Sequence, residues 1–289
     1  MKLVCVDMNL RFKPATHCAF LFTLIIALMN CSKDATGPSS EDYRYPLTTG
    51  NTWVYARTIT QTYQVSSGQR PPDSSASTIT VKSLGQEVLF DTLKTIKLME
   101  KIETDQAVQT HYQFYQNTGT AFSLIASVGA PVALPKKAAN IHTNAVEIFA
   151  GLICPNFGLL QGATLISADS LTVEKPAKIV LKYPLTPGTE WKYSEKNKPR
   201  RINKRVLNET DVRTSAGTFH AVQVRWILDF DGDGEFDDNV EYIDYIANEG
   251  LVKRSFLIKD LPIVDDEGTR IGKYDYQDVC LLTSVKMGS

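Results

Sequence analysis

The sequence lacks the motifs that mark the common enzyme classes. It has four histidines in 289 residues, and His111, His142 and His220 stand without metal-ligand spacing. No H-E-x-x-H, G-x-S-x-G, P-loop or dinucleotide-binding glycine pattern occurs. The acidic residues are scattered, so nothing selects the carboxylate pair of a glycosidase. We therefore expect a protein that is not an enzyme, with a secreted hydrolase as the alternative.

The sequence also lacks an excess of charge of either sign. Lys and Arg number 31 against 32 Asp and Glu, which gives a net charge of −1. A near-neutral chain generates no general field that would attract a polyanion. We expect no nucleic-acid partner.

Cysteine is scarce, with five in the chain. Cys5 and Cys18 fall in the leader described below, and Cys31 directly follows it. The remaining two, Cys154 and Cys280, could form a disulfide in an oxidising compartment. They could equally be buried thiols, because the sequence does not supply the geometry that a disulfide needs.

Long apolar runs are missing as well. The run Cys18–Met29 has twelve residues, whereas a membrane-spanning helix takes about 20. Arg11 and Lys13 precede the run, as in a secretory leader. A polar stretch rich in Ser, Gly and Pro follows it. The pattern predicts a signal peptide at residues 1–30 and a flexible tether at 31–42.

The end of this leader, Leu28-Met29-Asn30-Cys31, resembles a bacterial lipoprotein signal, in which the leader is cut before a cysteine that then carries lipid. Leu28 fits the pattern, while Asn30 replaces the usual Gly, Ala or Ser. The resemblance implies a lipid on Cys31 and a membrane partner through that lipid. Ser32 resembles the signal for outer-membrane sorting, so we expect the outer membrane rather than the inner. Ordinary secretion is the alternative.

An eleven-residue motif occurs twice, at 45–55 and 183–193, with seven identical positions at an offset of 138. We interpret the pair as an internal duplication. In each copy the proline favours an extended entry, the glycine permits a turn, and the W-x-Y spacing puts both aromatics on one strand face. These aromatics are expected to fill a sheet core, and a ligand-stacking platform is the alternative. The shared positions are Pro46, Gly50, Trp53 and Tyr55, and Pro184, Gly188, Trp191 and Tyr193.

Short alternating segments separated by turn residues predict an all-β fold with little helix. We expect an antiparallel curved sheet or incomplete barrel in one domain, 43–289. It would be built from two similar halves, about 43–125 and 181–289, with an intervening segment 126–180. A short helix is allowed at 144–152, and a long hairpin tip is expected at 66–75. The predicted strands are 53–65, 77–83, 86–90, 93–103, 108–116, 171–174, 178–183, 191–193, 203–213, 218–228, 240–246, 251–258 and 279–285.

The twin P-L-x-x-G-x-x-W-x-Y motifs, an A-G-T-F turn at Ala216–Phe219 and the stretch Gly250–Arg254 resemble a broad group of uncharacterised bacterial envelope lipoproteins. The resemblance implies an anchored β-rich body and transfers no catalytic residue. It favours a non-catalytic binding or scaffolding module. A carrier that holds acyl chains on the concave face of the sheet is the second reading.

The segment Asp229–Asp238 matches the first part of a calcium-binding loop, D-x-D-x-D-G. Val240 stands where a bidentate glutamate would normally close the site, and the flanks are expected to be strands. The alternative is an acidic β-turn. The predicted calcium ligands are Asp229, Asp231, Asp233, Glu235 and Asp237, with Asp238 or Glu241 closing the site.

One basic cluster lies at a predicted hairpin tip and its flank. An anionic envelope component, such as a lipid head group, is the functional interpretation. A solvated hairpin edge, charged against aggregation, is the alternative. The cluster consists of Lys196, Lys198, Arg200, Arg201, Lys204 and Arg205.

Overall fold

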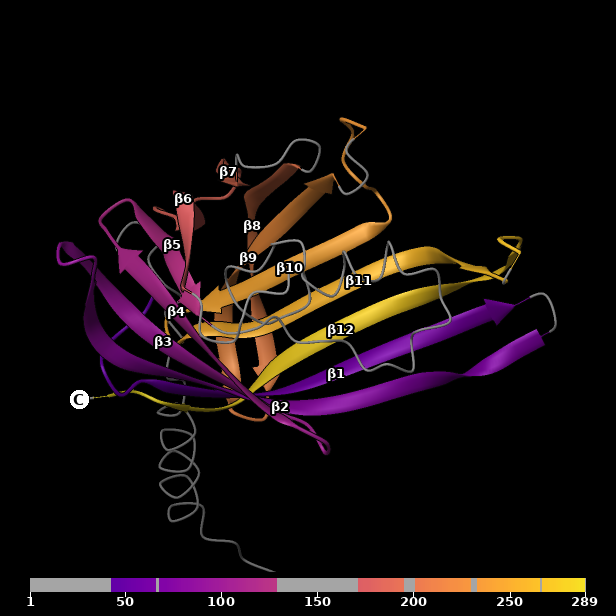
Figure 1. The fold of residues 1–289 in the computed structure, drawn as a ribbon, viewed down its shortest axis with the longest axis horizontal. Helices are drawn as coiled ribbons and strands as arrows, with labels where there is room; N and C mark the ends of the chain where they lie inside the picture. The colour runs from indigo at the N-terminus through magenta and orange to yellow at the C-terminus, as the bar shows by residue number, and fades with distance from the viewer. Residues whose placement is uncertain are drawn as a thin grey trace, which may run out of the picture. The chain divides into compact units, whose positions relative to one another are not determined.

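The protein is described by a computed structural model that covers residues 43–65, 68–128, 171–194, 201–229, 233–265 and 267–288. The chain divides into two units, Met1–Thr36 and Gly37–Ser289, and all the described residues belong to the second. Within these ranges the chain forms strands and turns without helix (Figure 1). Accordingly, no described helix is long and apolar enough to cross a bilayer. The predicted all-β class is confirmed.

Twelve strands make up the described fold. They are β1 (Thr52–Val65), β2 (Gly68–Leu89), β3 (Leu93–Glu103), β4 (Val108–Asn117), β5 (Ala121–Val128), β6 (Leu171–Lys182), β7 (Glu190–Ser194), β8 (Arg201–Thr214), β9 (Gly217–Asp229), β10 (Val240–Ala247), β11 (Gly250–Val264) and β12 (Arg270–Lys286).

All twelve strands belong to one antiparallel sheet, in the order β6-β5-β4-β3-β2-β1-β12-β11-β10-β9-β8-β7. Each half of the chain is therefore a six-stranded meander, and β1 pairs with β12 to join the two meanders. The sheet curls into a nearly closed barrel whose one unsealed seam lies between β6 and β7 (Figure 1). This confirms the predicted incomplete barrel.

The two motif copies occupy equivalent places, each leading into the first strand of a meander. Gly50 and Gly188 have φ of +89° and +86°, the left-handed region that glycine tolerates. The backbone hydrogen bonds of the two turns correspond one to one, although a common origin by duplication stays a prediction. They are Asn51 N to Thr48 O (3.1 Å), Gly50 N to Ser83 O (2.9 Å) and Ser83 N to Asn51 O (2.9 Å), and Thr189 N to Thr186 O (3.0 Å), Gly188 N to Val206 O (2.9 Å) and Val206 N to Thr189 O (2.9 Å).

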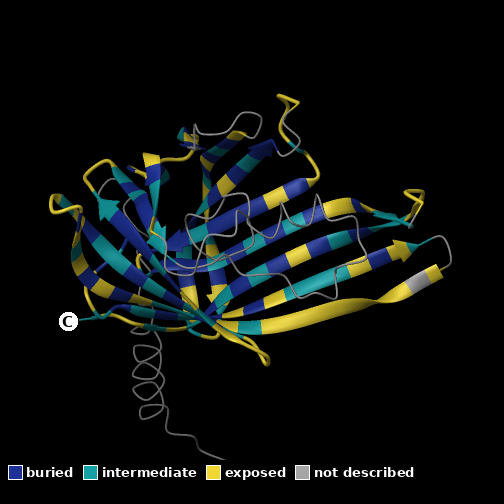
Figure 2. Ribbon diagram, in the orientation of Figure 1, coloured by how far each residue is buried: buried dark blue, intermediate teal, exposed yellow. Residues whose placement is uncertain are grey.

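The motif aromatics are core residues. Trp53, Tyr55, Trp191 and Tyr193 are all buried in one continuous apolar cluster. Aromatic rings also stack against one another within it, as between Trp226 and Tyr242 with centroids 4.6 Å apart. The inward faces of the strands are buried, whereas residues 70–76, near the start of β2, are exposed (Figure 2). Since large aromatics contribute most to burial, these side chains fill the barrel.

Three local predictions differ from the structure or fall outside it. The expected hairpin tip at 66–75 is largely strand, because β2 begins at Gly68 and pairs with β1. The polar, Ser-rich composition of this part of β2 gave no strand signal, because the segment is held by backbone pairing with β1 and not by side-chain burial. Strand β5 was not predicted at all. The short helix expected at 144–152 lies outside the described residues.

Candidate functional site

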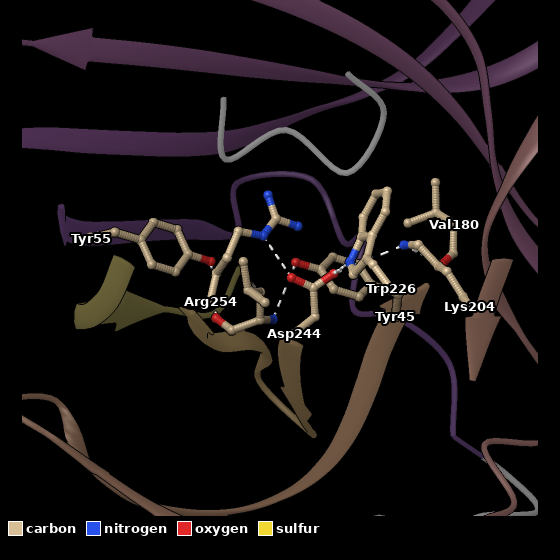
Figure 3. Close-up of polar contacts among 8 residues, drawn as sticks. Tyr45, Tyr55, Val180, Lys204, Trp226, Asp244 and Arg254 are labelled. Atoms are coloured by element: carbon tan, nitrogen blue, oxygen red, sulfur yellow. Dashed lines mark hydrogen bonds and ion pairs between the residues drawn. The ribbon is translucent and has the colours of Figure 1, made fainter. Parts of the chain in front are cut away.

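Charged side chains lie inside the aromatic core of the barrel. Lys204 on β8 and Asp244 on β10 have no exposed surface, and Arg254 on β11 is 3% exposed. Strand pairing brings them together, because Asp244 is directly opposite Arg254 and Lys204 is directly opposite Trp226. We call these three charged residues and Trp226 the buried charged centre (Figure 3).

Asp244 is the acceptor of this centre. Its Oδ1 accepts a hydrogen bond from Arg254 Nε at 2.6 Å, and its Oδ2 accepts one from Trp226 Nε1 at 2.8 Å. The Lys204 ammonium lies 3.9 Å from Oδ2. A buried carboxylate with two cations and an indole N–H is well compensated, because burying an ion is tolerable only when it is paired and hydrogen-bonded.

Lys204 is held by three kinds of contact. Its Nζ donates to Val180 O at 3.0 Å and lies 3.5 Å from the centroid of the Trp226 ring. The same Nζ is 5.0 Å from the Tyr193 ring centroid. Burial lowers the pKa of Lys204 from 10.5 to about 7, although the Asp244 charge acts in the opposite direction. The ammonium therefore loses its proton more readily than that of an exposed lysine.

Two side chains of the second meander bridge the seam. Trp191 Nε1 donates to Ile179 O at 2.9 Å, and Lys204 Nζ donates to the next carbonyl, that of Val180. Both acceptors belong to β6, whereas the donors come from β7 and β8. In the described part of the chain, β6 and β7 share no backbone ladder. Side-chain hydrogen bonds thus connect the two strands at the seam, whereas the other adjacent strands of the sheet are joined by backbone hydrogen bonds.

A second buried ion pair lies on the β1 and β12 wall. The Arg57 guanidinium binds the Asp278 carboxylate with Nη2 at 2.7 Å from Oδ2 and Nε at 3.0 Å from Oδ1. Cys280 lies opposite both Arg57 and Arg254 in the strand register. Burial raises the pKa of the Cys280 thiol, so the cysteine is an inert core residue and not a nucleophile.

Glu100 on β3 is the exception among the buried charges. It is 2% exposed, and neither carboxylate oxygen has a hydrogen-bond partner among the described residues. Burial raises its pKa from 4.5 to about 8, against the opposing effect of Arg254 and Arg57. Its cross-strand neighbour His111 is also buried, and burial lowers the pKa of that imidazole. Glu100 is therefore mostly protonated at neutral pH.

The N-terminal motif is tied to the strand that carries Arg254. Tyr55 Oη donates to Leu251 O at 3.0 Å, and Leu251 N donates to Tyr45 Oη at 3.4 Å. Trp53 Nε1 donates to the carbonyl of Glu249 in the adjacent turn. Figure 3 shows Tyr45 and Tyr55 beside Arg254. The motif therefore positions the β10–β11 hairpin, and with it the buried charged centre.

The chemistry open to this centre is proton binding and structural pairing. Lys204 and Glu100 have pKa values near neutral, as a general acid or base would. However, Lys204 and Asp244 have no exposed surface, so a substrate would reach them only if the sheet opened. The arrangement supports a structural role.

The predicted calcium loop is partly described. Asp229 is 1% exposed, and its Oδ2 accepts a hydrogen bond from Arg201 Nε at 3.0 Å. Arg201 Nη2 donates to the carbonyl of Gly234 in the same loop. Asp231 lies outside the described residues, and among the others no three His, Cys, Asp or Glu side chains are grouped to hold a metal ion. A guanidinium thus stands beside the Asp229 carboxylate, one of the predicted calcium ligands.

The predicted basic cluster is wrong for Lys204, which is buried. Arg205 is exposed and binds Glu190 with Nη2 2.6 Å from Oε2, and Arg201 binds Asp229 as described above. Lys196, Lys198 and Arg200 lie outside the described residues. Adjacency in the sequence suggested one surface, but alternation along β8 sends Lys204 inward and Arg205 outward.

Of the three cysteines with a predicted role, the described residues include only Cys280. Cys280 is a free, buried thiol. Cys154 and the predicted lipidation site Cys31 are not among the described residues, so a lipid on Cys31 stays a prediction.

Sequence reasoning missed the buried charged centre, although a signal was present. Each charged residue stands in the buried phase of an alternating strand, as Asp244 does between Tyr242 and Ile246. A charge at an inward position predicts a buried pair, since it cannot be left alone in the core. The others are Arg254 between Val252 and Phe256, and Lys204 between Ile202 and Val206. Outside the centre, Glu100 follows the same pattern between Leu98 and Ile102.

No family model and no curated protein matches the chain. Among solved structures, a candidate lipoprotein from Parabacteroides distasonis is similar over 85% of this chain and 100% of its own, with 13% identity and a TM-score of 0.32. A candidate exported protein with a YmcC-like fold from Bacteroides fragilis is similar over 84% of this chain and 99% of its own, with 12% identity and a TM-score of 0.36. Neither description names a catalytic activity.

Proposed function

We propose that the protein is a lipid-anchored component of a bacterial cell envelope, whose barrel is a non-catalytic binding or scaffolding module. The observation that carries the proposal is the position of Cys31. It stands between an apolar run of twelve residues and a polar tether, and the folded body begins soon after, by Tyr43. A lipid at this place would hold the barrel at a membrane surface without any spanning helix.

The buried charged centre supports the non-catalytic part of the proposal. Its charges are paired inside the core, where Asp244 lies between Arg254 and Lys204. A catalytic site would instead present convergent polar groups to a reachable cleft. The buried charges help to close the barrel, since Lys204 bonds to Val180 O across the seam. Binding would then use the outer surface and the turns.

Mass spectrometry of protein extracted from membranes tests the anchor. The N-terminal peptide should begin at Cys31 and carry the mass of two or three acyl chains. Cys31→Ala should abolish that mass and release the protein from the membrane fraction. Cys18→Ala, within the removed leader, is the matched control and should leave both unchanged. An N-terminus at another residue, without lipid, contradicts the proposal.

We also propose that the Asp229–Asp238 loop binds calcium in competition with Arg201. Because Arg201 pairs with Asp229 and Gly234 O, a calcium ion would have to displace the guanidinium. The ion would stabilise the connection between β9 and β10 and would take no part in a reaction.

A further inference from the structure

The turn between β2 and β3 presents an aromatic ring to solvent in an unfavourable backbone conformation. Phe90 and Asp91 have φ of +51° and +60°, and Thr92 N donates to Leu89 O at 3.3 Å to close the turn. Turns with two consecutive residues at positive φ usually contain Gly, Asn or Asp at those positions, because a bulky residue is strained there. Phe90 is nevertheless 60% exposed. Neither backbone preference nor burial explains a phenylalanine at this tip.

The residues beside Phe90 make the tip amphipathic. Val88 is 54% exposed, and Lys94 lies directly opposite it in the register. Further along the hairpin, Lys97 Nζ lies 3.0 Å from the Glu87 carboxylate. Asp91 adds one negative charge to the tip. The hairpin therefore ends in two exposed apolar side chains with a lysine just behind them.

Strand register places this tip at the same end of the barrel as the start of the described chain. Ile96 pairs with Tyr115, so the β2–β3 turn and the β4–β5 turn lie at one end. There Asn117 Nδ2 donates to Tyr45 O at 2.8 Å, which fixes the segment that follows the tether. In Figure 1, β2 and β3 meet at the left, the side on which the C-terminus is marked.

We propose that the β2–β3 tip contacts the lipid bilayer, with Phe90 and Val88 inserted at the level of the head groups. The inference rests on the lipid anchor proposed above. The tether, residues 32–42, reaches at most about 40 Å when fully extended, so it keeps this end of the barrel close to the membrane. Aromatic rings favour the interface, and Lys94 is placed to meet lipid phosphates.

The contact is confined to this tip. The β8–β9 turn projects from the same end, since Ile246 pairs with Val222 and β9 continues beyond that pair. On the strands that lead into this turn, Glu209 and Asp211 of β8 are each bound to His220 of β9 at 2.9 Å. Carboxylates are repelled by an anionic surface. We therefore assign that turn to the aqueous phase.

Tryptophan substitution in the full-length protein tests the proposal. Phe90→Trp is compared with Val108→Trp, because Val108 is 59% exposed but lies in the opposite turn region, at the start of β4. The three native tryptophans are buried and give a constant background. Both variants are reconstituted in vesicles of phosphatidylethanolamine and phosphatidylglycerol with brominated acyl chains. Circular dichroism of each variant confirms that the sheet is intact.

Emission from Trp at position 90 should shift to the blue and be quenched by the brominated chains, as expected for a ring at the membrane interface. Emission from position 108 should match that of the protein without vesicles. The proposal is overturned if both positions respond alike, if position 108 responds more, or if position 90 is shielded without vesicles by a second copy of the chain.

The outcome is separable from that of the anchor. If Cys31 carries lipid and position 90 is unquenched, the anchor stands and the inserted tip is wrong. If Cys31 is unmodified and position 90 is quenched by added vesicles, the tip stands and the anchor is wrong.

Discussion

Lys204 on β8 donates a hydrogen bond to the carbonyl of Val180 on β6, across the seam of the barrel. The same ammonium lies 3.9 Å from Asp244 and over the Trp226 ring. This buried cation thus connects the first meander to the second on the side where the described strands form no backbone ladder. The integrity of the seam and the pairing of the buried charged centre are therefore linked through Lys204.

Removing the acceptor of the centre should destabilise the protein strongly. Asp244→Ala leaves Arg254 and Lys204 buried without their carboxylate, and we expect a loss of about 3–5 kcal/mol in the free energy of unfolding. Urea titration measures it. Glu241→Ala is the control, because Glu241 lies on the same strand but is exposed. A surface change of this kind should cost no more than about 0.5 kcal/mol. Equal effects of the two variants would contradict the structural role of Asp244.

Stability should depend on pH in two opposing ways. The folded pKa of Glu100 is about 8 against 4.5, so the folded state binds more protons between these values and stability falls as pH rises from about 4.5 to 8. The folded pKa of Lys204 is about 7 against 10.5, so the unfolded state binds more protons and stability rises from about pH 7 to 10.5. The two slopes largely cancel between pH 7 and 8.

Variants separate these two contributions. Glu100→Gln should abolish the decrease in unfolding free energy that accompanies a rise in pH from 5 to 7. Lys204→Met should abolish the increase in unfolding free energy that accompanies a rise in pH above 8. Urea titrations at pH 5, 6, 7, 8 and 9 supply the comparison. A Glu100→Gln profile that parallels the native protein over pH 5 to 7 would show that this carboxyl does not titrate as argued.

The close approach of the motif to the β10–β11 turn gives a steric prediction. A Cβ at Gly250 would lie 2.9 Å from Tyr45 Oη and 3.3 Å from Trp53 Nε1, at a φ of +105°. Gly250→Ala should therefore cost about 1–3 kcal/mol beyond the backbone penalty. Gly188→Ala is the matched control, because its φ of +86° carries a backbone penalty but no atom lies within 4 Å of the added methyl. Thermal unfolding of both variants measures the difference, and equal losses would contradict the steric argument.

Calcium and Arg201 should compete for the Asp229 carboxylate. Isothermal titration should give weak calcium binding to the native protein and binding about tenfold tighter to Arg201→Gln, as expected when a positive charge near the ion is removed. Arg205→Gln should not change the affinity, because Arg205 binds Glu190 outside the loop. If neither the native protein nor the Arg201→Gln variant gives binding heat, the proposed calcium site is wrong.

The sequence was sufficient to predict most of the strands, since alternation marks their buried faces. The predicted strand 218–228 matches β9, in which the alternating residues Val222, Val224 and Trp226 are all buried. The polar half of β2 escaped because its side chains are exposed and only its backbone pairs. Burial patterns cannot reveal a strand that buries nothing.

The buried charged centre was harder to predict because its contacts are long-range. Lys204 was grouped with its basic sequence neighbours, although alternation with Ile202 and Val206 argued for the interior. Nothing in the sequence indicates that its acceptor is Val180 O. Backbone carbonyls carry no sequence signal, so a side-chain bridge to one of them appears only when the strands are placed in space.

The pairing of β1 with β12 has a consequence for how the protein is made. Thr52 pairs with Lys286, so the first of the described strands needs the last one as its neighbour. Contacts that span nearly the whole chain are slow to form, because the intervening loop must be closed before they contribute. The ladder between β1 and β12 can thus form only after β12 has been synthesised, so it cannot join the two meanders before the end of synthesis.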